Sequence, residues 1–270
     1  MTRDQAHSLA QRLEAAGLDW IVPDWGAPPS VHALVTTRNG GVSAGALATM
    51  NLGKGAGDTS EAVAENRSRL RAFLPSAPRW LHQVHGAAVA IHGAEEDRRP
   101  VVADAAITRE SGVVCAVMTA DCLPVLIADR RGSAVGVAHA GWRGLAAGVL
   151  ERTVAEMKSL GAGTDDLVAW LGPAIGPRAF EVGPEVVEAF VSTHPRSNAH
   201  FVRGAPGKWH ADLYGLARQR LTDCGVGSVG GGGFCTKTDA TRFYSWRRDR
   251  EGGRMAALIW LAPETAVPHV

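Results

Sequence analysis

Cysteine and histidine residues lie at the ends of two short apolar runs near the middle of the chain. Cys122 belongs to the stretch TADCLPVL, and His139 belongs to VAHAGWRG. Proteins use these two side chains to bind zinc or copper and to carry out nucleophilic catalysis. An upstream pair, His82 and His85 in LHQVHG, offers a third ligand. One cysteine with two histidines suits Zn²⁺ or copper better than Mg²⁺ or Ca²⁺.

Three interpretations of Cys122 and His139 follow from residue type and spacing. With a third ligand they would form a metal site that keeps one open position for water, as catalytic zinc sites do. Without a metal, Cys122 would be a nucleophile and His139 its base. Both could also be merely structural. In either chemical case Asp121, which precedes the cysteine, could steer a ligand or transfer a proton.

The upstream histidines belong to a predicted strand over residues 79–85. Alternation along a strand places His82 on one face and His85 on the other. At most one of them would therefore join a site shared with Cys122 and His139.

Two arginines are candidates for binding an anion. Arg143 precedes a helix predicted over residues 145–160, and the N-terminus of a helix offers free N–H groups to a phosphate. Arg38 begins the turn Arg-Asn-Gly-Gly, which predicts a hairpin, or else a strand end from which Arg38 contacts an anion. The glycine-rich residues 51–57 lack the spacing of a phosphate-binding P-loop and are interpreted as a loop.

Hydrophobic periodicity places the remaining elements around these residues. Continuous apolar runs indicate strands buried on both faces, and Cys115 within one of them is interpreted as a core residue. The run Gly230 to Gly233 predicts a flexible turn. Strands joined by hairpins, with helices between groups, indicate a single mixed-sheet α/β domain. Helices are expected over residues 3–16, 60–74, 145–160, 184–191 and 212–224, and strands over 31–37, 112–118, 123–128, 133–139 and 168–172, with a last hairpin joining 242–246 to 255–261.

Composition limits the classes of partner. The 270 residues carry 28 basic and 27 acidic side chains, a net charge of +1, so no overall field favours nucleic acid or an anionic membrane. Arg247, Arg248, Arg250 and Arg254 form a local basic cluster that is interpreted as solvated surface. No apolar run approaches the roughly 18 residues of a membrane span, and the first residues do not look like a signal peptide. Four cysteines do not suggest a disulfide framework, so the cytoplasm is the expected location.

Several motifs together resemble a known family. The stretches LHQVHG, TADCLPVL, AHAGWRG, LGPAIGP and FYSWRRD are similar to those of the laccase-domain-containing "polyphenol oxidase" family, whose members are also described as purine nucleoside phosphorylases and as a peptidoglycan editing factor. The resemblance runs from about Trp20 to Leu261. It divides the chain into an N-terminal helical extension, residues 1–19, and a single laccase-like, purine nucleoside phosphorylase-like catalytic domain, residues 20–270.

The resemblance implies a fold and a ligand set. The fold would be a single α/β/β/α-type domain, similar to that of a toxin deamidase with a Cys-His site. The metal, usually zinc with copper possible, would be held by His85, Cys122 and His139, which selects His85 over His82. The family element Thr-Arg-x-Gly-Gly-Val-Ser is matched from Thr37, which makes Arg38 a candidate substrate or phosphate contact.

The activities implied by the resemblance are those of a transferase and a hydrolase. They are phosphorolysis of adenosine, inosine and S-methyl-5′-thioadenosine to the base and ribose 1-phosphate or its methylthio analogue, and hydrolytic deamination of adenosine. The alternatives are a copper-dependent polyphenol oxidase and a Cys-His hydrolase acting on peptidoglycan precursors. A fourth possibility is a non-catalytic partner in cell division or cell-wall synthesis. None of the ten histidines forms a His-x-His pair of the kind that multicopper oxidases use, which argues against the oxidase.

Overall fold

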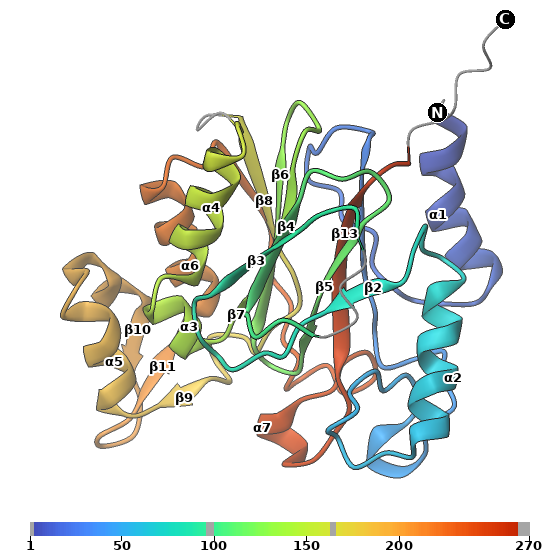
Figure 1. Cartoon of the computed structure of the whole chain (residues 1–270). Coiled ribbons are helices and arrows are strands. Elements are labelled where there is room, and N and C mark those ends of the chain that lie inside the picture. The colour runs from blue at the N-terminus through green and yellow to red at the C-terminus, as the bar shows by residue number, and fades with distance from the viewer. Residues whose placement is uncertain (1–2, 96–99, 163–165, 264–270) are drawn as a thin grey trace, which may run out of the picture.

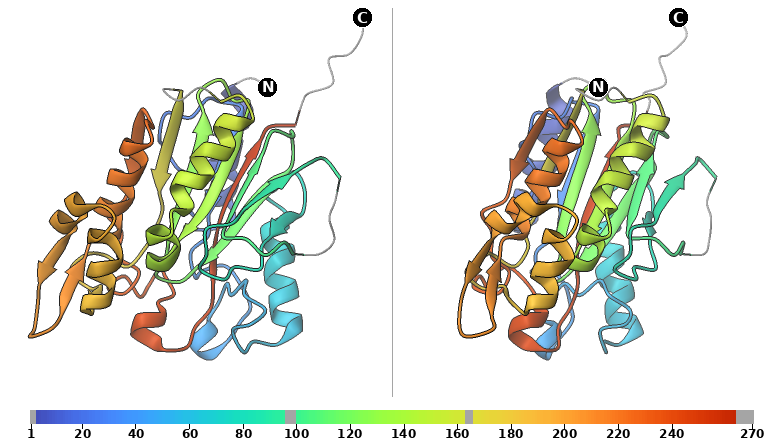
Figure 2. Two further views of the ribbon diagram at one scale, coloured as in Figure 1. Left: turned by 60° about the vertical axis from the view of Figure 1, so that its left-hand side comes forward. Right: turned by 90° about the vertical axis from the view of Figure 1, so that its left-hand side faces the viewer.

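Two β-sheets pack face to face in the computed structural model, and helices cover both outer faces (Figure 1). The structure describes residues 3–95, 100–162 and 166–263. The architecture is α/β/β/α, as predicted, and Figure 2 shows the four layers from two further sides.

The four-stranded sheet has the order β1-β13-β5-β2. Its central strands are buried on both faces, because Cys115 and Val117 point to the other sheet while Val114 and Ala116 point to the helices. This two-sided burial explains why the sequence shows an unbroken apolar run there. The strands are β1, Val31–Val35; β13, Met255–Leu261; β5, Val114–Thr119; and β2, Pro78–Trp80.

The six-stranded sheet has the order β12-β8-β6-β7-β4-β3. Along β6, Val125 and Ile127 pack on the helical side, whereas Leu126 and Ala128 pack between the sheets. The predicted antiparallel pair of β6 and β7 is confirmed. The strands are β12, Ser228–Gly231; β8, Leu167–Leu171; β6, Leu123–Asp129; β7, Val135–Ala140; β4, Ala105–Thr108; and β3, Val89–His92.

The helices divide between the two outer faces. Helices α1 (Arg3–Ala15) and α2 (Ser60–Arg71) cover the four-stranded sheet, and Leu9 and Leu13 of α1 are buried there beside Trp20. The N-terminal helix is therefore packed onto the domain. The six-stranded sheet is covered by α3 (Trp142–Ala146), α4 (Val149–Ser159), α5 (Pro184–Val191) and α6 (Leu213–Asp223).

The small elements lie outside these layers. The short helix α7 (Trp246–Asp249) precedes β13, and β9 (Glu181–Val182), β10 (Phe201–Arg203) and β11 (Trp209–Ala211) form a separate antiparallel sheet. Two 3₁₀ helices, Gly45–Leu47 and Pro195–His200, complete the described elements. No helix in residues 3–95, 100–162 and 166–263 is long and apolar enough to cross a membrane.

Several predictions of local structure were wrong. The turn after Arg38 does not make a hairpin, because β1 pairs with β13 from the other end of the chain. The segment 242–246 is no strand, since α7 begins at Trp246 and β13 pairs with β1 and β5. The helix over 145–160 is two helices, broken at Gly148 with φ of +86°. Gly230 and Gly231 belong to β12, which pairs with β8.

Candidate metal centre

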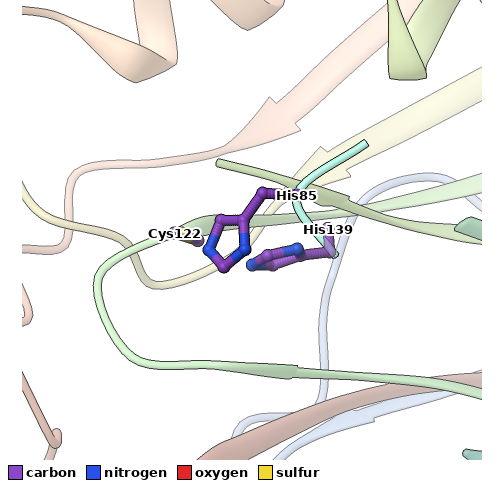
Figure 3. A group of neighbouring side chains, drawn as sticks. All are labelled: His85, Cys122 and His139. Atoms are coloured by element: carbon purple, nitrogen blue, oxygen red, sulfur yellow. The ribbon is translucent and has the colours of Figure 1, made fainter. Parts of the chain in front are cut away.

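Strand register brings Cys122 and His139 together. In the antiparallel pair of β6 and β7, Pro124 lies opposite His139 and Leu123 lies opposite Ala140. Cys122 immediately precedes β6, so its side chain and that of His139 meet at one end of the six-stranded sheet. Figure 3 shows the two side chains with the ring of His85 beside them.

His85 reaches the site from a loop and not from a strand. Strand β2 ends at Trp80, so the alternation predicted for residues 79–85 does not extend to either histidine. His85 has a φ of +61°, a left-handed conformation that costs energy for a residue with a side chain. His82 lines the same cavity as His85 but is not in the group of potential metal ligands.

A buried carboxylate, Asp104, holds the loop of His85 in place. Its Oδ2 accepts hydrogen bonds from the N–H groups of Val84 and Gly86, at 3.1 and 2.7 Å, and its Oδ1 accepts one from the N–H of His85 at 2.9 Å. Gln83 fixes the same loop to β5, because its amide exchanges two hydrogen bonds with the backbone of Met118. These bonds stabilise the unfavourable backbone of His85.

Asp104 also orients the second histidine. Nδ1 of His139 lies 2.8 Å from Oδ1 of Asp104, which directs Nε2 toward the cluster. No pattern in the sequence assigned a role to Asp104. The one signal was a charged residue directly before the apolar segment 105–108, in a position whose full burial only the tertiary structure reveals.

The ligand atoms of His85, Cys122 and His139 all lie within 4.8 Å of one another. Burial opposes ionisation of Cys122, but the charge of His139 and hydrogen bonds from both histidines outweigh it and lower the cysteine pKa to about 6. Burial also opposes the charge on His139, yet Cys122 and Asp104 raise its pKa to about 9. The metal-free site therefore favours a thiolate beside an imidazolium at neutral pH.

A glycine leaves the space that this cluster needs. A Cβ atom on Gly141 would lie 2.7 Å from Sγ of Cys122 and 3.3 Å from Cδ2 of His85. The backbone of Gly141 is extended, with φ of −62°, so glycine is required here for space and not for conformation.

Asp121 fixes the turn before Cys122. Its Oδ1 accepts a hydrogen bond from the hydroxyl of Thr236 at 2.6 Å, and its Oδ2 accepts one from the N–H of Arg247 at 2.7 Å. Its φ of +80° places it, like His85, in the left-handed region. Both carboxylate oxygens thus connect the turn to the C-terminal segments.

The cluster opens into a cavity of about 830 Å³. This volume lies within the usual range of ligand sites. His85, Asp121, Cys122, His139 and Arg143 all line it. Arg38 is not among the described residues of its lining: its guanidinium donates to the backbone oxygens of Ala48 and Ala240 and stacks on Tyr244.

The residues present fit a metal ion. They supply two imidazoles and a thiolate, the donors preferred by zinc and copper. The hydrogen bond from His139 to Asp104 is the carboxylate–histidine contact that usually supports a ligating imidazole. The group can therefore hold a metal through three protein ligands.

Comparison with known sequences finds similarity over most of the chain. The sequence model of a family described as multi-copper polyphenol oxidoreductase laccase matches residues 32–262. A purine nucleoside phosphorylase of Pseudomonas aeruginosa is 54% identical over 243 residues, which cover 90% of this chain and 98% of the relative. The purine nucleoside phosphorylase YfiH of Escherichia coli is 51% identical, covering 89% of this chain and 98% of its own length.

Comparison with solved structures gives the same fold. The crystal structure of the Neisseria meningitidis protein NMB0706 superposes with a TM-score of 0.86 at 48% sequence identity. The match covers 90% of this chain and 99% of that chain. The two-sheet architecture is therefore shared with a solved structure over most of the sequence.

Proposed function

The chain belongs to the multi-copper polyphenol oxidoreductase laccase family, and from this premise we propose that it is a zinc-dependent purine nucleoside phosphorylase acting in the cavity beside His85, Cys122 and His139. The observation that carries the proposal is the convergence of these three side chains at a cavity of ligand size. Relatives that match almost their whole length to this chain are named purine nucleoside phosphorylases. We propose adenosine, inosine and S-methyl-5′-thioadenosine as substrates.

The cavity offers aromatic surfaces for a purine. Trp80, Trp142, Phe180 and Trp246 line it, and the side chain of Trp246 is half exposed. Flat aromatic rings stack favourably on other flat ring systems, which suits a nucleobase. Arg143, which stacks on Trp142 at 4.4 Å, lies in the same lining and is a candidate substrate contact.

Phosphorolysis exchanges one bond at the ribose. An oxygen of phosphate forms a bond to C1′ while the bond from C1′ to N9 of the purine breaks. The bonding electrons leave with the purine, which takes up a proton and departs as the free base, and ribose 1-phosphate remains. The protein must bind phosphate and nucleoside side by side and exclude water from C1′.

We further propose hydrolytic deamination of adenosine, in which water replaces the amino group at C6 and ammonia leaves. A zinc ion held by His85, Cys122 and His139 would supply Lewis-acid chemistry for this reaction. In the protein, Asp104 would keep Nδ1 of His139 protonated so that Nε2 faces the metal, and Gly141 would keep the space around Cys122 clear.

A second candidate function rests on a different feature of the same residues. Cys122, His139 and Asp104 form a thiol–imidazole–carboxylate series, with the cysteine pKa lowered to about 6. Such a series activates the nucleophile of cysteine hydrolases without a metal. A hydrolase acting on peptidoglycan precursors would use this arrangement. A copper-dependent phenol oxidase would need several copper sites, and the described residues contain one group of three suitable ligands.

We propose a cytoplasmic location. All four cysteines are free thiols, and the thiolate of Cys122 requires reducing conditions to persist. We also propose that residues 1–19 are an extension to the catalytic domain of residues 20–270, since the family match begins at residue 32.

The experiment compares wild-type protein, metal-loaded and metal-free, with Cys122→Ala and the matched variant Cys224→Ala. Each is incubated with adenosine and phosphate while adenine, ribose 1-phosphate and inosine are followed. We expect products only from the metal-loaded forms of wild type and Cys224→Ala. Cys224 does not line the cavity, so its replacement should leave the activity unchanged. Full activity without metal would favour the cysteine hydrolase, and no purine product from zinc-loaded wild type would refute the phosphorylase.

A further inference from the structure

The cavity has a second chemically distinct part besides the metal ligands. It is formed by the glycine-rich loop that contains Lys54 and by the side chains of Arg67 and Arg254. Residues 51–57 lack the spacing of a P-loop, yet Gly53, Lys54, Gly55 and Ala56 all contribute to this lining. We call Lys54, Arg67 and Arg254 the basic wall.

The backbone holds the two guanidinium groups of the basic wall in position. Arg67 on α2 donates from Nε and Nη2 to the carbonyl oxygen of Leu52, at 3.0 and 2.8 Å, and stacks on Trp80 at 4.5 Å. Arg254, before β13, donates from Nη1 to the carbonyl oxygens of Gly252 and Gly253. Neutral carbonyl acceptors therefore orient both side chains without neutralising their charge.

The loop and Arg254 are packed against each other. The side-chain oxygen of Asn51 accepts hydrogen bonds from the N–H groups of Gly53 and Arg254, at 2.9 and 3.0 Å. A Cβ atom on Gly53 would lie 2.7 Å from Cγ of Arg254, so glycine permits this contact. The arrangement packs Gly53, the residue before Lys54, against Arg254 from the other end of the chain.

Charge around the cavity is strongly unbalanced. Lys54, Arg67, Arg143, Arg247 and Arg254 line it, whereas Asp121 is the carboxylate of its described lining. Both oxygens of Asp121 already accept hydrogen bonds from Thr236 and Arg247. Within the described residues, no carboxylate forms a salt bridge with any of the five cations, although seven bridges between other arginines and carboxylates occur elsewhere.

Partial burial makes this imbalance costly. Arg67 and Arg254 are half-buried, and desolvation lowers the pKa of both guanidinium groups. Arg67 forms no salt bridge within the described residues, and the charges of Cys122 and Asp121 only partly offset the desolvation of Arg254. An anion bound beside the two guanidinium groups would recover the interaction lost on burial. Arg254 is close enough to Cys122 to interact with it electrostatically, so such an anion would lie in the same reaction space as the metal ligands.

We propose that Lys54, Arg67 and Arg254 form a subsite for a phosphoryl oxyanion. The proposal deepens the proposed function and rests on it for the role of the anion, which would be the phosphate that attacks C1′. This subsite differs from the two phosphate positions that the sequence suggested, which were the helix N-terminus beside Arg143 and the turn at Arg38. Helix α3 has only five residues, and the guanidinium of Arg38 is bound to backbone oxygens outside the described lining of the cavity.

The test is calorimetric titration of metal-loaded protein with inorganic phosphate and, separately, with adenosine 5′-monophosphate. Arg67→Gln, Arg254→Gln and Lys54→Gln are compared with Arg69→Gln, an exposed position on the same helix whose side chain pairs with Glu65. We expect the dissociation constant to rise roughly 10- to 100-fold in each of the first two variants, as for loss of a charge-assisted hydrogen bond. Arg69→Gln should bind like wild type.

Lys54→Gln and one further variant, Arg67→Lys, separate binding from folding. Lys54 is exposed and makes no described contact, so Lys54→Gln cannot act through the fold, and it should weaken binding in the same direction. Arg67→Lys keeps the charge but loses the paired bonds to Leu52, and it should recover part of the affinity that Arg67→Gln loses.

The outcomes distinguish this proposal from the proposed function. Phosphate binding that depends on the basic wall, without phosphorolysis, would keep the subsite and refute the phosphorylase. Phosphorolysis with an unchanged KM for phosphate in all three variants would refute the subsite alone. Wall-dependent binding of the monophosphate but not of inorganic phosphate would keep the subsite and identify a phosphorylated substrate as the source. Binding of neither anion would overturn the subsite.

Discussion

The metal cluster and the basic wall line one cavity but are built in different ways. His139 and Cys122 lie at the ends of paired strands, and the buried carboxylate of Asp104 holds two of the three ligands from behind. Arg67 and Arg254 extend from a helix and a strand start and are held by neutral backbone oxygens. One region is fixed by charge-assisted hydrogen bonds inside the sheet layer, and the other keeps its charge available.

This difference corresponds to two chemical tasks. Metal ligands must hold a fixed geometry. A buried residue such as Asp104, which accepts hydrogen bonds on both carboxylate oxygens, provides it. A site for a mobile anion needs uncompensated positive charge and access from the cavity. Changes in the first region should therefore abolish metal binding, whereas changes in the second should alter affinity for an anion and leave the metal in place.

The largest expected effect is that of Cys122→Ala. Loss of the thiolate leaves two imidazoles, and zinc affinity should fall by more than about 100-fold, beyond what loss of a supporting residue alone causes. Metal content by mass spectrometry, with Cys224→Ala as the control, measures this. Stoichiometric zinc in Cys122→Ala would mean that the metal does not depend on the cluster.

Gly141→Ala should have nearly the same effect by a steric route. The added methyl group would lie 2.7 Å from the sulfur of Cys122, closer than nonbonded atoms approach, and would displace the ligand. The extended backbone tolerates alanine, so the thermal unfolding midpoint should change little. Zinc content and phosphorolysis are the measurements, and a fully active Gly141→Ala protein would show that the cluster geometry is wrong.

Asp104→Asn should weaken the metal site by a smaller factor. The amide nitrogen would face the donors of Val84 and Gly86, and the contact that orients His139 would lose its charge. Zinc affinity should fall roughly 10- to 100-fold. Asp129→Asn is the matched control, because Asp129 is equally buried but lies at the far end of β6 from Cys122. Equal loss of zinc in both variants would indicate a general effect on folding.

The ionisation state of Cys122 tests the electrostatics of the metal-free cluster. Because the pKa of Cys122 is lowered to about 6, its thiol should be ionised at neutral pH and should take up a proton as the pH falls below about 6. Ultraviolet absorbance of the thiolate, taken as the difference between metal-free wild type and Cys122→Ala, follows this change. A Cys122 thiolate that appears only above about pH 8, as for an ordinary thiol, would contradict a lowered cysteine pKa.

Gly148→Ala should leave the site almost unchanged. Gly148 has a φ of +86°, where alanine costs roughly 1–2 kcal/mol of stability, but the nearest atom to its new Cβ is 3.7 Å away. Chemical denaturation should show this loss while zinc content stays at the wild-type value. Loss of zinc from Gly148→Ala would mean that the break between α3 and α4 positions the cluster.

The sequence predicted the metal end of the cavity better than the basic wall. Cys122 and His139 terminate adjacent strands of a local hairpin, so apolar runs and a short connection were enough to bring them together. His85 was selected only by the family motifs, because its loop follows no strand alternation. Asp104 was missed, since its role depends on pairing between β4 and β7.

The basic wall depends on contacts that are distant in sequence. Arg254 meets the loop of Gly53 because β13 pairs with β1 and β5, a pairing that local patterns misassigned to a C-terminal hairpin. The expected helix over 145–160 similarly concealed the break at Gly148, because a stripe of apolar residues continues on both sides of it. Periodicity identifies buried faces, but it does not identify which distant strands become neighbours.

The most direct test of phosphorolysis is whether the zinc-loaded protein converts inorganic phosphate to ribose 1-phosphate. Zinc-loaded protein with adenosine and inorganic phosphate is followed by phosphorus NMR, with adenine and hypoxanthine measured in parallel. We expect ribose 1-phosphate to accumulate in an amount equal to the two free bases together, and none of these products to form without phosphate or with Cys122→Ala. Adenine released without phosphate, or no ribose 1-phosphate from the zinc-loaded protein, would contradict phosphorolysis.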